Sequence, residues 1–276
     1  TSELVVNNLG QKLESYYSVV VPEYNSFFDY QDDICYGQDI TESPTSTVKG
    51  ATQIELATTF ESFREGNTKN VGYTVGSLLL LYGISDKVEI RLGTDLLQEY
   101  ELVDKIRADD ISSGYTPLML GAGADIIEEK GFWPQVTLIG DIFLPKTGGN
   151  DFRQDNLGYA LKAGFFHNLG KNQNAQLNYN LGANFANDDL AYVYAITYLR
   201  NIGSIGGAYF EVNGSLPDGS SPDHYVSVAF YWTPSANIQF DTIVGRGINA
   251  DQDFYITGRL QIYIPNLTAG KAGNKT

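Results

Sequence analysis

The sequence has 276 residues, of which 42% are hydrophobic, 13% aromatic and only 18% charged, and its formal net charge is −15. Abundant aromatic residues argue against a disordered chain, and the 29 glycines and 19 tyrosines argue against a mainly helical one. An acidic chain lacks the basic surface that neutralises phosphates, so we exclude nucleic acid as a partner.

The first 43 residues contain no clear strand. They hold two apolar and aromatic patches, at 16–21 and 24–30, followed by an acidic run. A disordered tail would not normally concentrate so many aromatic residues. We therefore consider three roles for residues 1–43: a strap across the domain that follows, a plug inside it, or a docking surface for other proteins.

The start of the chain and its cysteine content narrow the compartment. Cys35 is the only cysteine, which excludes an intrachain disulfide and a thiolate zinc site. The chain begins with Thr1-Ser2, without an initiator methionine or an apolar signal segment, so we expect a mature product whose signal peptide has been removed. The longest apolar run, at 78–84, is shorter than the roughly 20 residues of a membrane helix, although a membrane-spanning strand needs only about 10.

From Gly50 onward the chain alternates between apolar and polar side chains. In 51–63, for example, Ile54 and Leu56 alternate with Glu55, and the same period recurs at 88–96, 176–185 and 254–264. Period-two alternation over such lengths predicts β-strands. We expect 12 strands, centred near Leu56, Leu78, Ile90, Leu120, Leu138, Leu161, Leu181, Tyr194, Phe210, Val228, Phe240 and Leu260.

The connections between these strands alternate in length. Short turns follow the even-numbered strands, and longer polar loops follow most odd-numbered ones, at 98–114, 146–156, 216–223 and 247–253. A unit of an aromatic-ended strand, a tight turn and an amphipathic strand occurs four times. This organisation predicts an antiparallel up-and-down meander.

Three features favour a membrane barrel over a soluble β-sandwich. Short turns alternate with long loops, as in outer-membrane barrels. Trp133, Trp232, Tyr82 and Tyr198 fall at the short-turn ends of strands, which predicts an aromatic girdle. The polar strand face carries too many charges for a dry core. We expect these ten residues to line a lumen and to serve transport: Glu55, Glu89, Arg91, Asp95, Asp125, Asp141, Lys162, Glu211, Asp241 and Arg259.

Several short segments resemble one known family. Residues 40–44 (Ile-Thr-Glu-Ser-Pro), 48–50 and 53–55 are similar to the opening signature of the meta-pathway phenol-degradation family of outer-membrane proteins, and 81–91 and 128–135 also look similar. The chain departs from the signature at 36–39, where the family usually has Asp-Arg-Pro before Thr-Glu-Ser-Pro. The resemblance implies an outer-membrane transporter-like barrel that takes up aromatic or other apolar compounds.

The sequence offers little support for catalysis or for bound cofactors. Only His167 and His224 could act as a general base near neutral pH, and no Gly-x-Ser-x-Gly motif is present. The run 249–253 has oxygen ligands at alternate positions but lacks the glycine and the distal glutamate of a calcium-binding EF-hand loop. We therefore expect no enzyme activity, no catalytic residues, no metal and no cofactor.

We expect an all-β protein, a 12-stranded antiparallel up-and-down transmembrane barrel of the Gram-negative outer membrane. Residues 1–49 form an N-terminal strap or plug, 50–264 the barrel and 265–276 a periplasmic tail. Lipid, including lipopolysaccharide, is the expected partner of the outer face. The expected function is a passive or gated conduit for a small solute, by default aromatic or apolar. The alternative is a non-transporting accessory or anchoring subunit that binds other outer-membrane proteins through residues 1–43.

Overall fold

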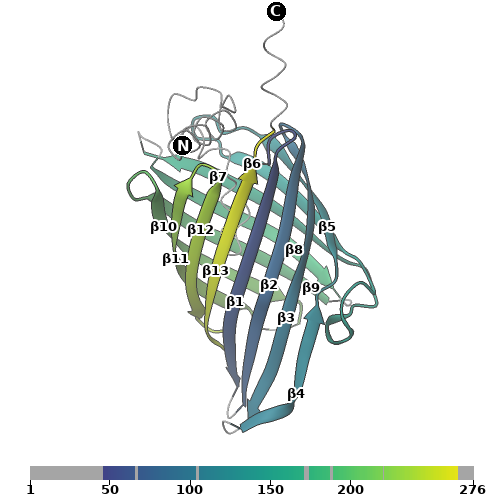
Figure 1. Ribbon diagram of the computed structural model, residues 1–276. Coiled ribbons are helices and arrows are strands. Elements are labelled where there is room, and N and C mark those ends of the chain that lie inside the picture. Colours follow the sequence, from purple (N-terminus) through teal and green to yellow (C-terminus); the bar gives the residue numbers. More distant parts are fainter. Residues whose placement is uncertain are drawn as a thin grey trace, which may run out of the picture.

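The computed structural model describes residues 46–65, 68–103, 106–170, 174–186, 189–219 and 221–266. In these residues the chain forms one antiparallel sheet that closes into a barrel (Figure 1). Its elements are β1 (Thr52–Glu65), β2 (Thr68–Ser85), β3 (Val88–Val103), β4 (Ile106–Tyr115), β5 (Met119–Ile127), β6 (Gln135–Phe143), the short 3-10 helix η1 (Asn150–Phe152), β7 (Gly158–Leu169), β8 (Ala175–Ala186), β9 (Asp189–Asn201), β10 (Gly206–Pro217), β11 (Asp223–Ser235), β12 (Ile238–Gly247) and β13 (Gln252–Ile264).

The barrel closes because β1 bonds to β2 on one side and to β13 on the other. Leu56 of β1, for example, lies between Leu78 of β2 and Leu260 of β13. Twelve strands form the wall, in agreement with the strand number that the alternation predicts. The thirteenth, β4, is no extra wall strand, because it pairs with the far half of β3 while β5 pairs with the near half.

The two ends of the barrel differ. We call the end where β1 begins and β13 ends the turn end, because it carries the short β2–β3 turn; the opposite end is the loop end, where β3 and β4 project beyond the wall (Figure 1). The prediction of a loop at 98–114 is therefore wrong, because most of these residues form the paired hairpin of β3 and β4. A hairpin surrounded by water needs no apolar face, so it lacks the alternation that identifies the wall strands.

The barrel has apolar side chains on its outside and polar ones on its inside, the opposite of a water-soluble protein. Large apolar side chains of the wall strands are exposed, among them Leu161, Leu181 and Phe230 at 58–63%. The buried side chains between them are largely polar or charged, including Gln53, Glu211 and Gln261 at 1% or less. An apolar outer band around a polar interior is the arrangement of transmembrane β-barrels, so the prediction of a membrane barrel is confirmed over the soluble sandwich.

Aromatic side chains mark the turn end of the outer face. Tyr82, Trp133, Tyr198 and Trp232 are all exposed, at 41–72%, and Trp133 lies in the connection between β5 and β6. Rings that are partly apolar and partly polar favour the boundary between lipid and water. In the described part of the chain, no helix has the length and apolar character needed to cross a membrane.

The predicted terminal segments fall mostly outside the described residues. Of the segment 1–49, only Ser46–Lys49 are described, and of the tail 265–276 only Pro265 and Asn266. Cys35 and the aromatic patches of residues 1–43 are outside this part of the chain. The division into strap, barrel and tail therefore stays a prediction.

Candidate functional site in the barrel interior

All ten charged residues predicted for the lumen lie on the polar, inward face of the strands. Glu89, Arg91, Asp141, Glu211, Asp241 and Arg259 are buried, with 0–9% exposure, and Glu55, Asp95, Asp125 and Lys162 are half-buried. In their strands they lie an even number of positions from most of the other buried residues. They therefore share the inward face, because alternate side chains of a strand point to opposite faces. The structure divides them into groups with different partners. Their part in transport stays a prediction.

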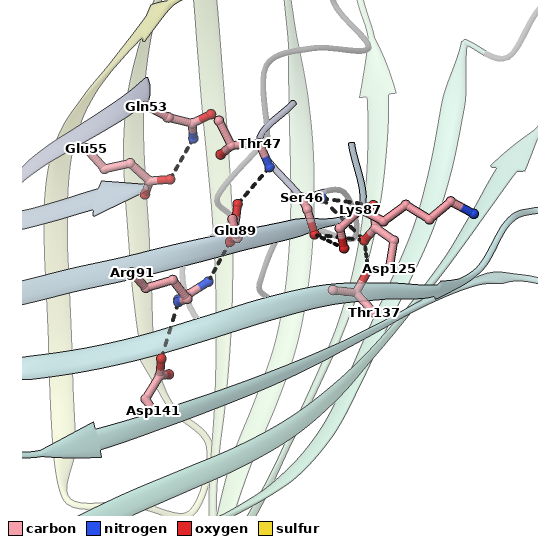
Figure 2. A network of polar contacts seen from close by, with 10 residues as sticks. All are labelled: Ser46, Thr47, Gln53, Glu55, Lys87, Glu89, Arg91, Asp125, Thr137 and Asp141. Carbon is pink, nitrogen blue, oxygen red and sulfur yellow. Dashed lines mark hydrogen bonds and ion pairs between the residues drawn. The ribbon is translucent and has the colours of Figure 1, made fainter. Parts of the chain in front are cut away.

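The first group, the Arg91 cluster, joins β3 to β6 across the strand between them, β5. Arg91 of β3 lies with its Nη1 3.5 Å from Glu89 Oε1 and its Nε 3.3 Å from Asp141 Oδ1 of β6 (Figure 2). Gly121 of β5 stands between Arg91 and Asp141 in the sheet, and a Cβ there would come within 1.9 Å of Asp141 Oδ1. Glycine at this position thus gives the carboxylate room to reach the guanidinium.

The second group, the Arg259 cluster, lies on the neighbouring strands β12 and β13. Asp241 and Arg259 are direct cross-strand partners, with Arg259 Nε 3.2 Å from Asp241 Oδ2. Arg259 Nη2 also donates to the Tyr209 hydroxyl at 3.2 Å, and Gln239 Nε2 donates to Asp241 Oδ1 at 3.0 Å. The pair therefore has the extra hydrogen bonds that a buried ion pair needs to offset its desolvation.

Neutral polar side chains complete the interior, and sequence reasoning missed them because it considered only charges. Thr197 Oγ1 donates to Glu211 Oε2 at 2.8 Å, and Asn213 Nδ2 donates to Glu211 Oε1 at 3.0 Å. These residues share the parity of the charged positions, which is the signal that could have identified them. Other buried members of the same face are Gln53, Asn178, Asn180, Tyr209, Tyr231, Gln239, Tyr255, Gln261 and Tyr263.

Ser46 and Thr47, which precede β1 at the turn end, contact Asp125 and Glu89 of the barrel interior. We call this contact the latch. The backbone N–H of Thr47 donates to Glu89 Oε2 at 2.7 Å, and that of Ser46 donates to both oxygens of Asp125 at 3.2–3.3 Å (Figure 2). Ser46 and Thr47 are buried, at 6% and 0% exposure. Since Glu89 also faces Arg91, the latch and the Arg91 cluster form one continuous network.

Gly83 of β2 allows the latch segment to approach the wall. A Cβ at Gly83 would lie 2.2 Å from the Thr47 carbonyl oxygen and 2.1 Å from that of Val48, both backbone atoms that cannot move aside alone. We expect Gly83→Ala to destabilise the barrel by about 1–3 kcal/mol, as overpacking does. Gly76→Ala on the same strand is the matched control, because a Cβ there meets nothing within 4 Å. Urea unfolding of both variants in detergent checks this, and equal midpoints would contradict it.

A charge pair outside the barrel wall ties two connections at the turn end. Lys87 Nζ lies 2.6 Å from Glu128 Oε1. This hydrogen bond raises the pKa of the Lys87 ammonium and lowers the pKa of the Glu128 carboxyl. Both side chains are largely exposed, so the pair contributes little to stability.

The two histidines have tyrosine neighbours. His224 Nδ1 lies 2.8 Å from the Tyr194 hydroxyl, and His167 Nε2 lies 3.5 Å from the Tyr179 hydroxyl. Over the described ranges, neither imidazole has a hydrogen bond to a serine or a carboxylate, the partners that a hydrolase triad would need.

The run 249–253, which has part of a calcium-loop pattern, ties the loop end together. Asn249 Oδ1 accepts from the His224 N–H at 2.8 Å, and Asp253 lies 3.5 Å from Arg64 Nε. Among the residues that the structure describes, no three His, Cys, Asp or Glu side chains gather in a way that could hold a metal ion.

The comparisons with known proteins agree with this architecture. Residues 38–258 match the family described as the MetA-pathway of phenol degradation, which confirms the resemblance in the sequence. The chain matches none of the curated proteins compared with it.

Several solved structures resemble the chain. An outer membrane channel from Pseudomonas putida F1 has a TM-score of 0.62 at 13% identity, over 80% of this chain and 97% of the channel. The KdgM porin has 0.50 at 11% identity, over 76% and 98%. The transport unit of the autotransporter AIDA-I from Escherichia coli has 0.50 at 10% identity, over 87% and 97%. At these identities the likeness establishes the fold, a barrel of the outer-membrane type.

Proposed function

The chain belongs to the MetA-pathway of phenol degradation family, and on that premise we propose that it is a selective, gated outer-membrane conduit for a small solute. The observation that carries the proposal is the interior of a closed barrel, which is lined by polar and ionisable side chains while its outer face is apolar. A barrel serving only as an anchor would not need buried arginines and carboxylates, because each is costly to desolvate. By the family's description, an aromatic or apolar solute is the default class.

Selectivity and gating in this proposal follow from how the interior is filled. Side chains such as Gln53, Glu211 and Gln261 are almost fully buried, so the interior is densely packed around them. Twelve strands also enclose less space than the 16–18 strands of general porins. The latch fixes residues 46–47 at the turn end, and we propose that the preceding segment closes the conduit there. Lipid, including lipopolysaccharide, would cover the outer face in a Gram-negative outer membrane.

The same dense filling supports a second candidate, a non-transporting accessory or anchoring subunit of a larger outer-membrane assembly. In this reading the buried polar side chains hold the barrel rigid, and residues 1–43 bind the partner protein. The two candidates differ in one measurable property, because only the conduit passes ions or solutes when its N-terminal segment is displaced.

Conductance in a planar lipid bilayer tests the proposal, with the full chain and a variant lacking residues 1–43. The variant keeps Ser46 and Thr47, so the latch contacts with Asp125 and Glu89 remain. We expect discrete conductance steps that are more frequent after truncation. We also expect preference for cations, because the ten charged residues predicted for the lumen are seven acids and three bases. Silence from both proteins, with the barrel shown to be folded, would favour the accessory subunit.

A further inference from the structure

A cavity of about 340 Å³ lies inside the barrel toward the loop end. Its walls come from β1, β10, β11 and β13, and the lining residues that matter here are Glu61, Phe63, Asn213, Tyr225, Gln252 and Tyr255. The volume suits a small organic molecule, since ligand sites start near about 300 Å³. We call this cavity the vestibule.

Among the residues that the structure describes, two buried amides in the vestibule wall have acceptors without partners. Gln252, 8% exposed, donates its Nε2 to Glu61 Oε2 at 3.2 Å, and its Oε1 accepts no hydrogen bond from this part of the chain. Asn213, 1% exposed, donates its Nδ2 to Glu211, and its Oδ1 likewise accepts none from the described residues. Each amide thus gives its donor to a carboxylate and keeps an acceptor unused. Buried acceptors are normally satisfied, so this arrangement fits a ligand that brings hydrogen-bond donors.

The charged side chains that line the vestibule are acidic. An adjoining cavity of about 490 Å³ shares Glu61 and Phe63 with it and adds Glu99 and Glu101. Of the described residues that line the two cavities, none is a lysine or an arginine. Such walls attract cations and repel anions such as carboxylates.

Aromatic rings stand beside these acceptors. Phe63, Tyr225 and Tyr255 contribute to the vestibule, and Tyr100 lines the adjoining cavity. The guanidinium carbon of Arg107 lies 4.7 Å from the centre of the Tyr100 ring, so one ring at this end already holds an organic cation against its face. A ligand with both an aromatic ring and a cationic donor would use both properties of the wall.

We propose that the vestibule is a binding site for small aromatic ammonium compounds, with the ammonium group at Glu61 and the neighbouring Gln252 Oε1 and the ring among Phe63, Tyr225 and Tyr255. The inference rests on the proposed conduit function and names a solute class for it. An ammonium group has three donors, so it can bond to the Glu61 carboxylate and to the amide oxygen of Gln252, which lies beside it.

Calorimetric titration of the full chain in detergent with four probes tests the site. The probes are 2-phenylethylammonium, its uncharged analogue 2-phenylethanol, the anion 3-phenylpropionate and the ringless cation ethylammonium. We expect 2-phenylethylammonium to bind at least tenfold more tightly than each of the others. Equal binding of 2-phenylethanol would overturn the ammonium assignment, and tighter binding of 3-phenylpropionate would overturn the charge argument.

Variants locate the binding. Glu61→Gln should weaken 2-phenylethylammonium binding about tenfold, since it removes the charge that strengthens the hydrogen bond. Tyr225→Leu should weaken it roughly threefold through the lost ring face. Asp86→Asn, which removes an exposed acid from the turn end, is the matched control and should bind normally. An Asp86→Asn loss equal to that of Glu61→Gln would show general charge attraction and no site.

The conductance of the same proteins separates this inference from the proposed function. A barrel that conducts but does not bind 2-phenylethylammonium contradicts the vestibule site and leaves the conduit intact. A barrel that binds the probe but never conducts contradicts the conduit, and the vestibule then stands as a binding site only.

Discussion

Replacing Arg91 by methionine should destabilise the barrel by about 3–5 kcal/mol, the usual loss when one partner of a buried ion pair is removed. Arg91 is 6% exposed, and it lies between Glu89 and Asp141, which are equally buried. The substitution removes the guanidinium that lies against both carboxylates. Urea unfolding in lipid vesicles, followed by tryptophan fluorescence, measures the change.

Arg200→Met is the matched control for this prediction. Arg200 lies on β9, is exposed and should change stability by no more than about 0.5 kcal/mol. The size of the stability loss in Arg91→Met also shows whether water reaches the Arg91 cluster. A loss as small as that of the control would mean that the Arg91 cluster is solvated, because exposed ion pairs contribute only about 0–1 kcal/mol.

Replacing Thr47 by proline should raise the open probability of the barrel in planar bilayers by about tenfold or more. Proline has no N–H, so the bond to Glu89 Oε2 is lost, and a hydrogen bond to a charged group contributes about 1.5–3 kcal/mol. If residues 1–45 close the conduit, weakening their attachment at the latch favours the open state.

Thr47→Ala separates the backbone contact from the side chain. It keeps the N–H, and the Thr47 hydroxyl that it removes has no hydrogen-bond partner among the described residues. We therefore expect Thr47→Ala to conduct like the original chain. An identical increase in both variants would place the effect in side-chain packing, and no increase in either would exclude the latch as part of a gate.

The strands of the wall were predictable because a strand with one face toward lipid alternates apolar and polar residues. Each wall strand has one apolar face, as in the alternation of Leu260 and Ile262 with Arg259 and Gln261, so both strand and inward residues follow from the sequence. The β3–β4 hairpin was not predictable in this way. It lies beyond the apolar band, where neither face has to be apolar.

The partners of the charged residues were only partly predictable. Arg91 and Glu89 are two residues apart on one strand, and their pairing follows from the pleat. Asp141 is contributed by β6. Its carboxylate reaches Arg91 only because Gly121, which lies between them, has no side chain. The latch gave little signal, since its donors are mainly backbone N–H groups that every residue except proline carries, together with the Ser46 hydroxyl, which donates to Asp125 Oδ1 at 3.2 Å.

The seam between β1 and β13 has a consequence for how the protein is made. Thr59 and Thr257, whose hydroxyls lie 2.9 Å apart across the seam, are separated by 198 residues in the chain. The edge of β1 that faces β13 has no partner until the last strand has been synthesised. During that interval it is an open strand edge of the kind that pairs with other chains. A nascent chain therefore needs protection from aggregation until β13 arrives, and the loss of β13 alone should prevent assembly of the whole wall.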